Sequence, residues 1–302
     1  MKEVFENVKC AVCGSADTQL VTKNGQFNIP LNVVLCKACG LGYLNPRWDE
    51  NTYFDFYSNT YDSYYRPSLI KEINTVTPSE NIIYKRLKKV NLFTKEFDSI
   101  LDIGSGAGEN LLNFQKLYPN AELEAIEPSH EAQAHLRRNK INVISSDANS
   151  DWELANDKKY SLIILRHVLE HFLEPRLVLK KIRKTLTDDG ILYIAVPNNL
   201  NPKKNLESFW FRVVHTYYFN KHSIYNLLAL EKLEIVLLGE GDEMGPNELF
   251  VAVRKANTEI KPKISKKHFE KQINVFSERL KIDNKLVNKL KRVASKFIAK
   301  KI

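Results

Sequence analysis

The feature that most constrains the fold is an alternation, between residues 96 and 255, of short β-branched runs with helical patterns. Seven runs are candidate strands: Ser99–Ile103, Glu122–Ile126, Asn142–Ile144, Ser161–Leu165, Ile191–Val196, Glu234–Leu238 and Glu248–Val253. Helical segments separate the first five, as parallel strands require. The last two are close in sequence, which indicates an antiparallel hairpin. We therefore predict an α/β fold with a Rossmann-like, doubly wound, seven-stranded sheet whose last strand is antiparallel.

The composition is that of an ordinary globular protein. The 302 residues are 43% hydrophobic and 27% charged, which is sufficient for a full-sized core. No apolar run approaches the roughly 20 residues that span a bilayer, and the first residues contain no apolar signal core. We therefore expect a cytoplasmic protein.

The sequence divides into four parts. Residues 1–48 form a cysteine module, 49–95 a tyrosine-rich helical cap or linker, 96–255 the α/β domain and 256–302 a basic tail. The tail has apolar residues at helical spacing and carries 14 Lys or Arg against 4 Asp or Glu. We predict an amphipathic helix. Its composition suits packing on its own domain, contact with the inner face of a membrane, pairing with another helix, or nucleic-acid binding.

All four cysteines of the chain lie in the N-terminal module, as two Cys-x-x-Cys-Gly pairs: Cys10, Cys13, Cys36 and Cys39. In a reducing compartment this pattern favours a metal over disulfides. Four thiolates complete the tetrahedron of a structural Zn²⁺ and leave no open position for chemistry. We predict a small zinc ribbon whose folding depends on the metal. Two disulfides or an iron site are the alternatives. Nucleic-acid binding is disfavoured because the module has few basic residues.

A glycine turn follows the first candidate strand. The segment reads Leu101-Asp102-Ile103-Gly104-Ser105-Gly106-Ala107-Gly108. Glycines let the backbone approach a ligand and adopt positive φ. Dinucleotide-binding proteins share such turns, but here an acid precedes the first glycine and no Lys or Arg faces a pyrophosphate. The turn therefore indicates another nucleotide-like cofactor.

Acidic residues end the next two strands. Glu127, followed by Pro128, is placed to accept hydrogen bonds from two ribose hydroxyls. Asp147, followed by Ala148, is placed to accept from an adenine amino group. Any one of these acids would also suit a helix cap or a loop. Their joint occurrence at strand ends favours cofactor binding.

With these motifs the chain resembles class I S-adenosylmethionine-dependent methyltransferases. The resemblance covers residues 96–255, and the cysteine module is similar to one found ahead of bacterial methyltransferases that act on sugars and polysaccharides. It implies that Asp102 and the turn, Gly104, Ser105, Gly106 and Gly108, position the methionine part of the cofactor. It further implies that Glu127 holds the ribose and that Asp147 and Ala148 flank the adenine.

The fourth strand ends in Arg166-His167-Val168-Leu169-Glu170-His171. Ligands of open α/β sheets bind at this edge, so Arg166 and His167 are candidates for the cofactor pocket. His167, Glu170 and His171 form a candidate acid–base set, since methylation of a hydroxyl requires removal of a proton. In the alternative interpretation Glu170 and His171 cap the following helix.

Two further candidates come from aromatic segments. His215 lies in an insert that walls the acceptor site in related methyltransferases. Tyr61, with neighbouring tyrosines, is a candidate lid over the cofactor, because aromatic faces attract a sulfonium. Core packing for the aromatics of the insert and a surface interface for the tyrosines are the alternatives.

The sequence thus predicts S-adenosylmethionine as cofactor and a structural Zn²⁺. The expected reaction is O-methylation of a sugar, glycan or small phosphorylated metabolite in surface-polysaccharide biosynthesis. The short tail disfavours C-methylation, for which similar enzymes carry a further catalytic domain. The alternatives are a nucleic-acid methyltransferase and a non-catalytic cofactor-binding scaffold.

Overall fold

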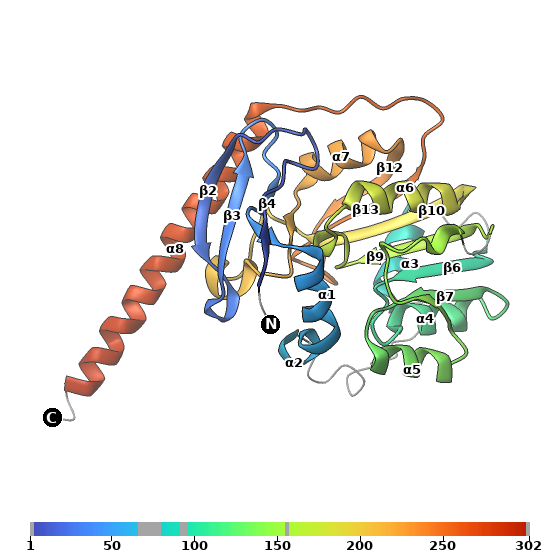
Figure 1. Cartoon of the computed structure of the whole chain (residues 1–302), viewed down its shortest axis with the longest axis horizontal. Helices are drawn as coiled ribbons and strands as arrows, with labels where there is room; N and C mark the ends of the chain where they lie inside the picture. The colour runs from blue at the N-terminus through green and yellow to red at the C-terminus, as the bar shows by residue number, and fades with distance from the viewer. Residues whose placement is uncertain (1–2, 66–79, 91–95, 155–156, 300–302) are drawn as a thin grey trace.

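The computed structural model describes residues 3–65, 80–90, 96–154 and 157–299, without the side chains of Asp62 and of residues 286–299. At its centre is the predicted seven-stranded sheet (Figure 1). In spatial order its strands are β12 (Leu233–Glu240), β13 (Glu248–Lys255), β10 (Leu186–Pro197), β9 (Tyr160–Arg166), β6 (Ser99–Ile103), β7 (Glu122–Ile126) and β8 (Asn142–Ser145). β13 is antiparallel to β10 and β12, and the remaining pairs are parallel. The mixed α/β fold and the reversed strand are confirmed.

Alternating side chains of the central strands supply two apolar layers. Ile100, Leu162 and Ile164 face one layer, whereas Leu101 and Ile163 face the other. This period of two explains why the central strands read as continuous apolar runs, because both faces are covered. Helices α3 (Ile82–Lys88), α4 (Glu109–Leu117) and α5 (His130–Arg138) pack on the first face, and α6 (Pro175–Thr185) and α7 (Lys221–Leu230) on the second (Figure 1).

The N-terminal module forms a second sheet that shares a strand with the main domain. Its order is β11 (Tyr217–Tyr218), β4 (Gly42–Leu44), β3 (Pro30–Cys36) and β2 (Thr18–Asn24). β11 comes from the insert between β10 and α7, so the insert joins the module to the seven-stranded sheet. A short pair, β1 (Phe5–Glu6) with β5 (Arg47–Trp48), leads into α1 (Glu50–Asn59) and α2 (Tyr61–Tyr65). Arg47 is buried and donates to Glu6 and to the Leu173 carbonyl.

The tail forms one unbroken helix, α8 (Lys266–Ala299). Its first part packs against β2, β3 and the π-helical turn η5 (Leu206–Trp210), with Phe276 buried against Phe211. Gln272 bridges Asn220 and the Asn199 carbonyl, and Asp283 accepts from the Leu206 amide at 2.8 Å. The far end of the helix projects beyond the sheets (Figure 1).

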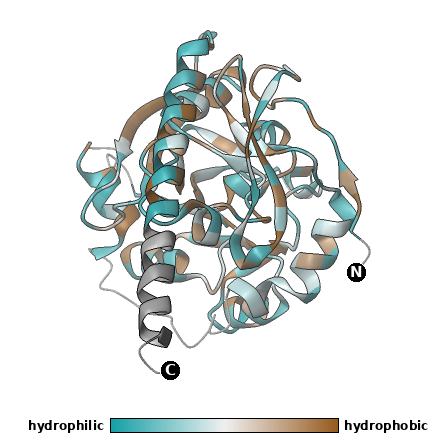
Figure 2. Cartoon of the chain, turned by 90° about the vertical axis from the view of Figure 1, so that its left-hand side faces the viewer, coloured by the Kyte–Doolittle hydropathy of each residue, from teal (hydrophilic) through white to brown (hydrophobic). Residues whose placement is uncertain are grey.

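The outer side of α8 is largely hydrophilic (Figure 2). Within the described ranges, α8 included, no helix combines the length and apolar character needed to cross a membrane.

Candidate active site

The sheet brings the predicted cofactor residues to one edge. β6, β7, β8 and β9 are parallel, so the segments that follow them lie at the same side of the sheet. The glycine turn follows β6, Glu127 follows β7, Asp147 follows β8 shortly after its end, and His167 follows β9. These four segments surround the place where a ligand of such a sheet binds.

The glycine turn has the backbone that the sequence indicates. Gly104, Gly106 and Gly108 have φ values of 70°, 56° and 83°, in the left-handed region. A Cβ on Gly104 would lie 2.5 Å from a methyl group of Val168, and one on Gly108 would lie 2.4 Å from Leu136. The turn is therefore pressed against the segment after β9 and against α5, and no larger residue fits at these two positions.

Asp102 is a buried acid beneath the turn. It is 1% exposed and accepts from the Asn110 side-chain amide at 3.3 Å. Burial raises the pKa of its carboxyl to about 7, with the Glu127 charge adding to this effect and Asn110 opposing it. A cationic ligand group next to Asp102 would favour its ionised form. Such a buried acid suits the amino group of the methionine part of the cofactor.

Glu127 links the turn to β7. Its carboxylate accepts from the Gly106 amide at 2.7 Å and from the Ser129 amide at 3.0 Å, and the residue is fully buried. Pro128 beside it is exposed. The buried Ser105 hydroxyl has no hydrogen-bond partner among the residues that the structure describes. A cradle with an unpartnered hydroxyl and two acids fits a polar ligand such as S-adenosylmethionine.

Asp147 and Ala148 lie in the turn after β8. Asp147 is half-buried and accepts from the Asn149 amide at 2.8 Å, so it caps its own turn. Ala148 is buried, and its carbonyl accepts from the Trp152 ring nitrogen at 3.0 Å. A half-buried acid next to a small apolar residue is compatible with the predicted adenine position.

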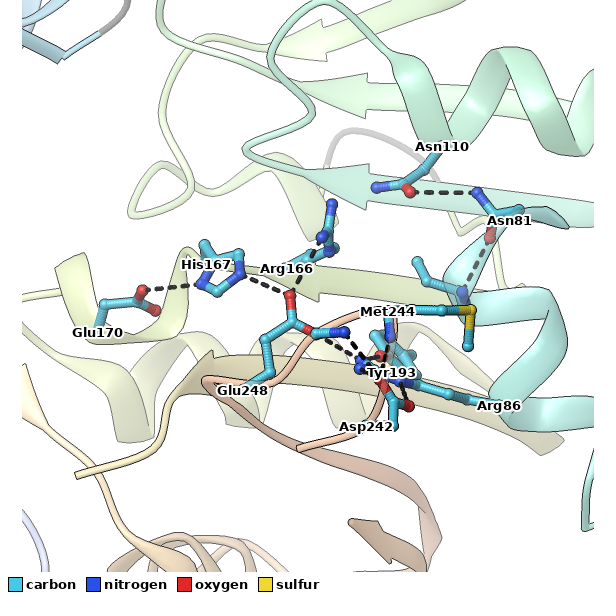
Figure 3. Close-up of polar contacts among 12 residues, drawn as sticks. Asn81, Arg86, Asn110, Arg166, His167, Glu170, Tyr193, Asp242, Met244 and Glu248 are labelled. Carbon is cyan, nitrogen blue, oxygen red and sulfur yellow. Dashed lines mark hydrogen bonds and ion pairs between the residues drawn. The ribbon is translucent and has the colours of Figure 1, made fainter. Parts of the chain in front are cut away.

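His167 lies between two carboxylates (Figure 3). Its Nε2 is 2.8 Å from Glu248 and its Nδ1 is 3.7 Å from Glu170. Burial would lower the pKa of His167, but these two carboxylates outweigh that effect and raise the pKa to about 9. The residue has a φ of 56°, a strained value outside glycine. The two carboxylates therefore favour the protonated form of His167.

Glu248, the first residue of β13, anchors an ion network that sequence reasoning missed. It accepts from Arg166 at 3.1 Å and from Arg86 at 2.5 Å (Figure 3). Burial opposes its charge, but His167, Arg166 and Arg86 hold its pKa at about 2. Arg86 also contacts both carboxylate oxygens of Asp242 and the Tyr193 hydroxyl. Lys85 and Arg86 stand side by side in the segment Ile82–Leu87, so the sequence does not mark Arg86 as the buried one.

Glu170, His171 and His215 form a second cluster. One potential ligand atom from each lies within 4.8 Å of those of the others. The two imidazole rings meet edge to face with centroids 4.9 Å apart. Burial, and then the charge of His171, lower the pKa of His215 well below its usual value. The insert that carries β11 therefore delivers His215 beside the predicted acid–base pair.

Tyrosines of α1 and α2 cover this cluster. The Tyr57 hydroxyl, which sequence reasoning missed, lies 2.9 Å from His171 Nδ1. The Tyr61 ring lies 5.0 Å from that of Tyr57 and 6.5 Å from that of His171. Tyr64 and Tyr65 instead pack edge-on against Phe27 of the N-terminal module. The spacing of four between Tyr57 and Tyr61, one helical turn, was the sequence signal.

The four cysteines meet at the ends of two matching knuckles. Cys10 and Cys39 sulfurs are 3.5 Å apart, and Cys13 and Cys36 sulfurs are 3.4 Å apart, with all four thiols free. Zn–S bonds of about 2.3 Å place tetrahedral sulfurs roughly 3.8 Å apart. The donor set and its compactness fit a structural Zn²⁺.

The family model described as "Methyltransferase domain" matches residues 79–238. An uncharacterised methyltransferase of Schizosaccharomyces pombe is 27% identical over 146 residues, which are 45% of this chain and 49% of that protein. N-methyltransferase 4 of Papaver somniferum is 30% identical over 109 residues, 33% and 30% of the two chains. A ubiquinone biosynthesis O-methyltransferase of Pelagibacter ubique is 29% identical over 180 residues, 58% and 67% of the two chains.

The chain thus spans about half or less of the first two of these relatives. Among solved structures, the plantazolicin methyltransferase BpumL in complex with SAH is 17% identical, with a TM-score of 0.49 over 68% of this chain and 97% of that chain. A methyltransferase from Clostridium acetobutylicum is 14% identical, with a TM-score of 0.44 over 68% and 99%.

Proposed function

Because the chain belongs to the methyltransferase-domain family, we propose that it transfers the methyl group of S-adenosylmethionine to an oxygen of a sugar, glycan or small phosphorylated metabolite. The observation that carries the proposal is the position of the cofactor cradle. Val168, which contacts Gly104, lies between His167 and the Glu170–His171 pair. The cofactor turn and the candidate acceptor cluster are therefore neighbours.

In the proposed reaction the acceptor oxygen attacks the methyl carbon in line with the sulfur. The O–C bond forms, the S–C bond breaks, the sulfonium becomes a neutral thioether and the hydroxyl proton passes to the Glu170–His171–His215 cluster. Alignment supplies much of the rate. His167 keeps its proton, because its pKa is about 9. The Glu170–His171–His215 cluster is therefore the group that activates the hydroxyl.

The choice of oxygen and of a sugar-like acceptor has separate support. The relative from Pelagibacter ubique is named as an O-methyltransferase, although the one from Papaver somniferum is named as an N-methyltransferase. The knuckles at Cys10–Gly14 and Cys36–Gly40 resemble in sequence the module found ahead of sugar and polysaccharide methyltransferases, and this resemblance supports a sugar-like acceptor. We assign these cysteines to a structural Zn²⁺ that shapes the module beside the acceptor side.

The projecting end of α8 has a surplus of Lys and Arg. We propose that it contacts the inner face of a membrane, or a helix of a partner, where a glycan acceptor is assembled. Liposome co-sedimentation of the chain with and without residues 286–302 tests this role. Equal sedimentation of both proteins contradicts the membrane contact.

Calorimetry with S-adenosylhomocysteine tests whether the chain binds the cofactor that the proposed function requires. Binding is expected in the micromolar range, as for a product of about 26 heavy atoms, and Glu127→Ala is expected to weaken it. The absence of binding contradicts the methyltransferase proposal. A panel of candidate acceptors, assayed by a mass gain of one methyl group, then identifies the substrate. His171→Ala and His215→Ala are expected to lose turnover while they retain cofactor binding.

A further inference from the structure

The buried carboxylate of Glu170 has ion-pair contacts with His167 and His171 but accepts no hydrogen bond at normal distance from a described residue. The residue is 1% exposed, and neither carboxylate oxygen has a hydrogen bond within the part of the chain that the structure describes. The nearest basic atoms are His167 Nδ1 at 3.7 Å and His171 Nε2 at 3.9 Å, beyond hydrogen-bonding distance. A buried carboxylate in this state is costly unless a cation or a substrate group completes it.

The surroundings of Glu170 supply further ligands for a metal. His171 and His215 bring two imidazoles, and the three potential ligand atoms lie within 4.8 Å of one another. Ligand atoms about 2.1 Å from a tetrahedral ion stand roughly 3.4 Å apart. Small rotations of the three side chains would therefore bring their ligand atoms from within 4.8 Å of one another to the separation found around a bound ion.

The outer contacts are those that orient metal ligands. The Tyr57 hydroxyl lies 2.9 Å from His171 Nδ1 and can accept a hydrogen bond from Nδ1–H, which leaves Nε2, 3.9 Å from Glu170, with a free lone pair for a metal ion. His167 lies on the other side of Glu170 and is itself held by Glu248. Three side chains could thus ligate one ion. Tyr57 orients His171, and His167 lies beside Glu170.

We propose that Glu170, His171 and His215 bind a divalent transition-metal ion such as Zn²⁺, Mn²⁺ or Co²⁺. Two imidazoles and one carboxylate suit this class of ion and leave positions for other ligands. The inference deepens the proposed function and rests on it for its role: an ion here would lower the pKa of a bound acceptor hydroxyl. His171 is then a ligand, and the ion activates the hydroxyl.

The test measures metal content, which is independent of activity. The full chain and the variants Glu170→Gln and His215→Gln are dialysed against Zn²⁺ alone, and bound zinc per chain is measured by mass spectrometry. We expect each variant to hold one ion fewer than the wild type. The control His135→Gln, a histidine on α5 that contacts Asn139, is expected to match the wild type.

Co²⁺ spectra identify the site that is lost. Thiolate ligation gives intense charge-transfer bands in the near ultraviolet, whereas a site of nitrogen and oxygen donors gives weak visible bands only. We expect the variants to lose only the weak visible bands of the nitrogen and oxygen site, seen as a difference spectrum against the wild type, and to retain the charge-transfer and intense visible bands of the cysteine site. Equal metal content in the wild type and both folded variants overturns the metal site.

Calorimetry with S-adenosylhomocysteine on the same proteins separates the two proposals. If the wild type binds S-adenosylhomocysteine but holds no ion beyond the cysteine site, the methyltransferase proposal stands and the metal site is overturned. If it holds the additional ion but does not bind S-adenosylhomocysteine, the metal site stands and the methyltransferase proposal is overturned. Melting curves show whether each variant is folded. If one variant fails to fold, the zinc content of the other variant still tests the metal site.

Discussion

At the scale of single residues, Asp102 combines burial with a position in β6 directly before the glycine turn. Its carboxyl is 1% exposed, and burial raises its pKa to about 7. In the ligand-free protein this raised pKa contributes stability below the usual carboxyl pKa, and that contribution is lost as pH rises through about 7. A bound amino group reverses the preference, because it stabilises the ionised carboxylate.

Cofactor affinity is therefore expected to rise with pH near neutrality. Between about pH 6 and about pH 8 the dissociation constant of S-adenosylhomocysteine should fall, by up to about tenfold per pH unit below the pKa. Asp102→Asn should bind S-adenosylhomocysteine weakly, with an affinity that does not change with pH. Asp98 is an acid just before β6, and the control variant Asp98→Asn should keep the pH dependence of the wild type. Calorimetry at several pH values across this range measures the dissociation constant of each protein. A flat wild-type profile contradicts the assignment of Asp102.

Glu248 shows which residues could not be found from sequence. Its partner Arg86 is 162 positions away, and nothing local in either segment indicates the pair. The acids after β7 and β8 and the histidines after β9 could be predicted to lie at one edge, because the ends of parallel strands converge. The buried arginine at the centre of the ion network follows only from tertiary packing.

Removal of the Glu248 charge is expected to destabilise the fold. Glu248→Gln leaves the buried Arg86 guanidinium with one carboxylate fewer, at a cost of about 3 kcal/mol, and also removes a carboxylate from the more exposed His167. Asp242→Asn should cost less, because the Asp242 side chain is 19% exposed, against 6% for Glu248. Urea unfolding of both variants measures the difference. Equal losses contradict the dominant role of Glu248.

At the scale of elements, the prediction succeeded where a pattern is local. Ser99–Ile103 and Glu122–Ile126 were predicted to the residue, because β-branched runs bounded by turns mark buried parallel strands. β11, with two residues, has no pattern of its own and exists through its pairing with β4. The extent of contact between module and insert could therefore not be predicted.

The two cysteine knuckles provide a matched pair for a prediction. Gly14 and Gly40 have φ values of 71° and 77°, and each amide donates to the first cysteine carbonyl of its pair at 2.8 Å. A Cβ on Gly14 meets nothing within 4 Å, whereas one on Gly40 lies 2.6 Å from the His268 backbone. Gly14→Ala is expected to cost about 1–2 kcal/mol, the price of a left-handed backbone.

Gly40→Ala should cost more than Gly14→Ala, because it also displaces the start of α8. Thermal melting should rank the two variants in this order, and limited proteolysis should cut α8 faster in Gly40→Ala alone. Similar melting and cleavage of both variants would show that the contact between Gly40 and α8 does not stabilise the helix.

At the scale of the whole molecule, α8 joins the module to the catalytic domain. Its first part contacts β2, β3 and η5, and Gln272 bonds to residues on both sides of the insert. Phe276 is fully buried in the aromatic cluster beside Phe211. The helix is thus part of the wall behind the segment that carries His215.

Two truncations separate this structural role from any role of the projecting end. Removal of residues 286–302 should leave the melting temperature and S-adenosylhomocysteine affinity unchanged. Removal of residues 266–302 exposes the pocket of Phe276, a loss on the order of 3–5 kcal/mol from that side chain alone. Because the insert then loses its support, turnover should fall more than cofactor affinity. Melting, calorimetry and the acceptor assay measure these three quantities, and a stable, active 1–265 chain would contradict the supporting role of α8.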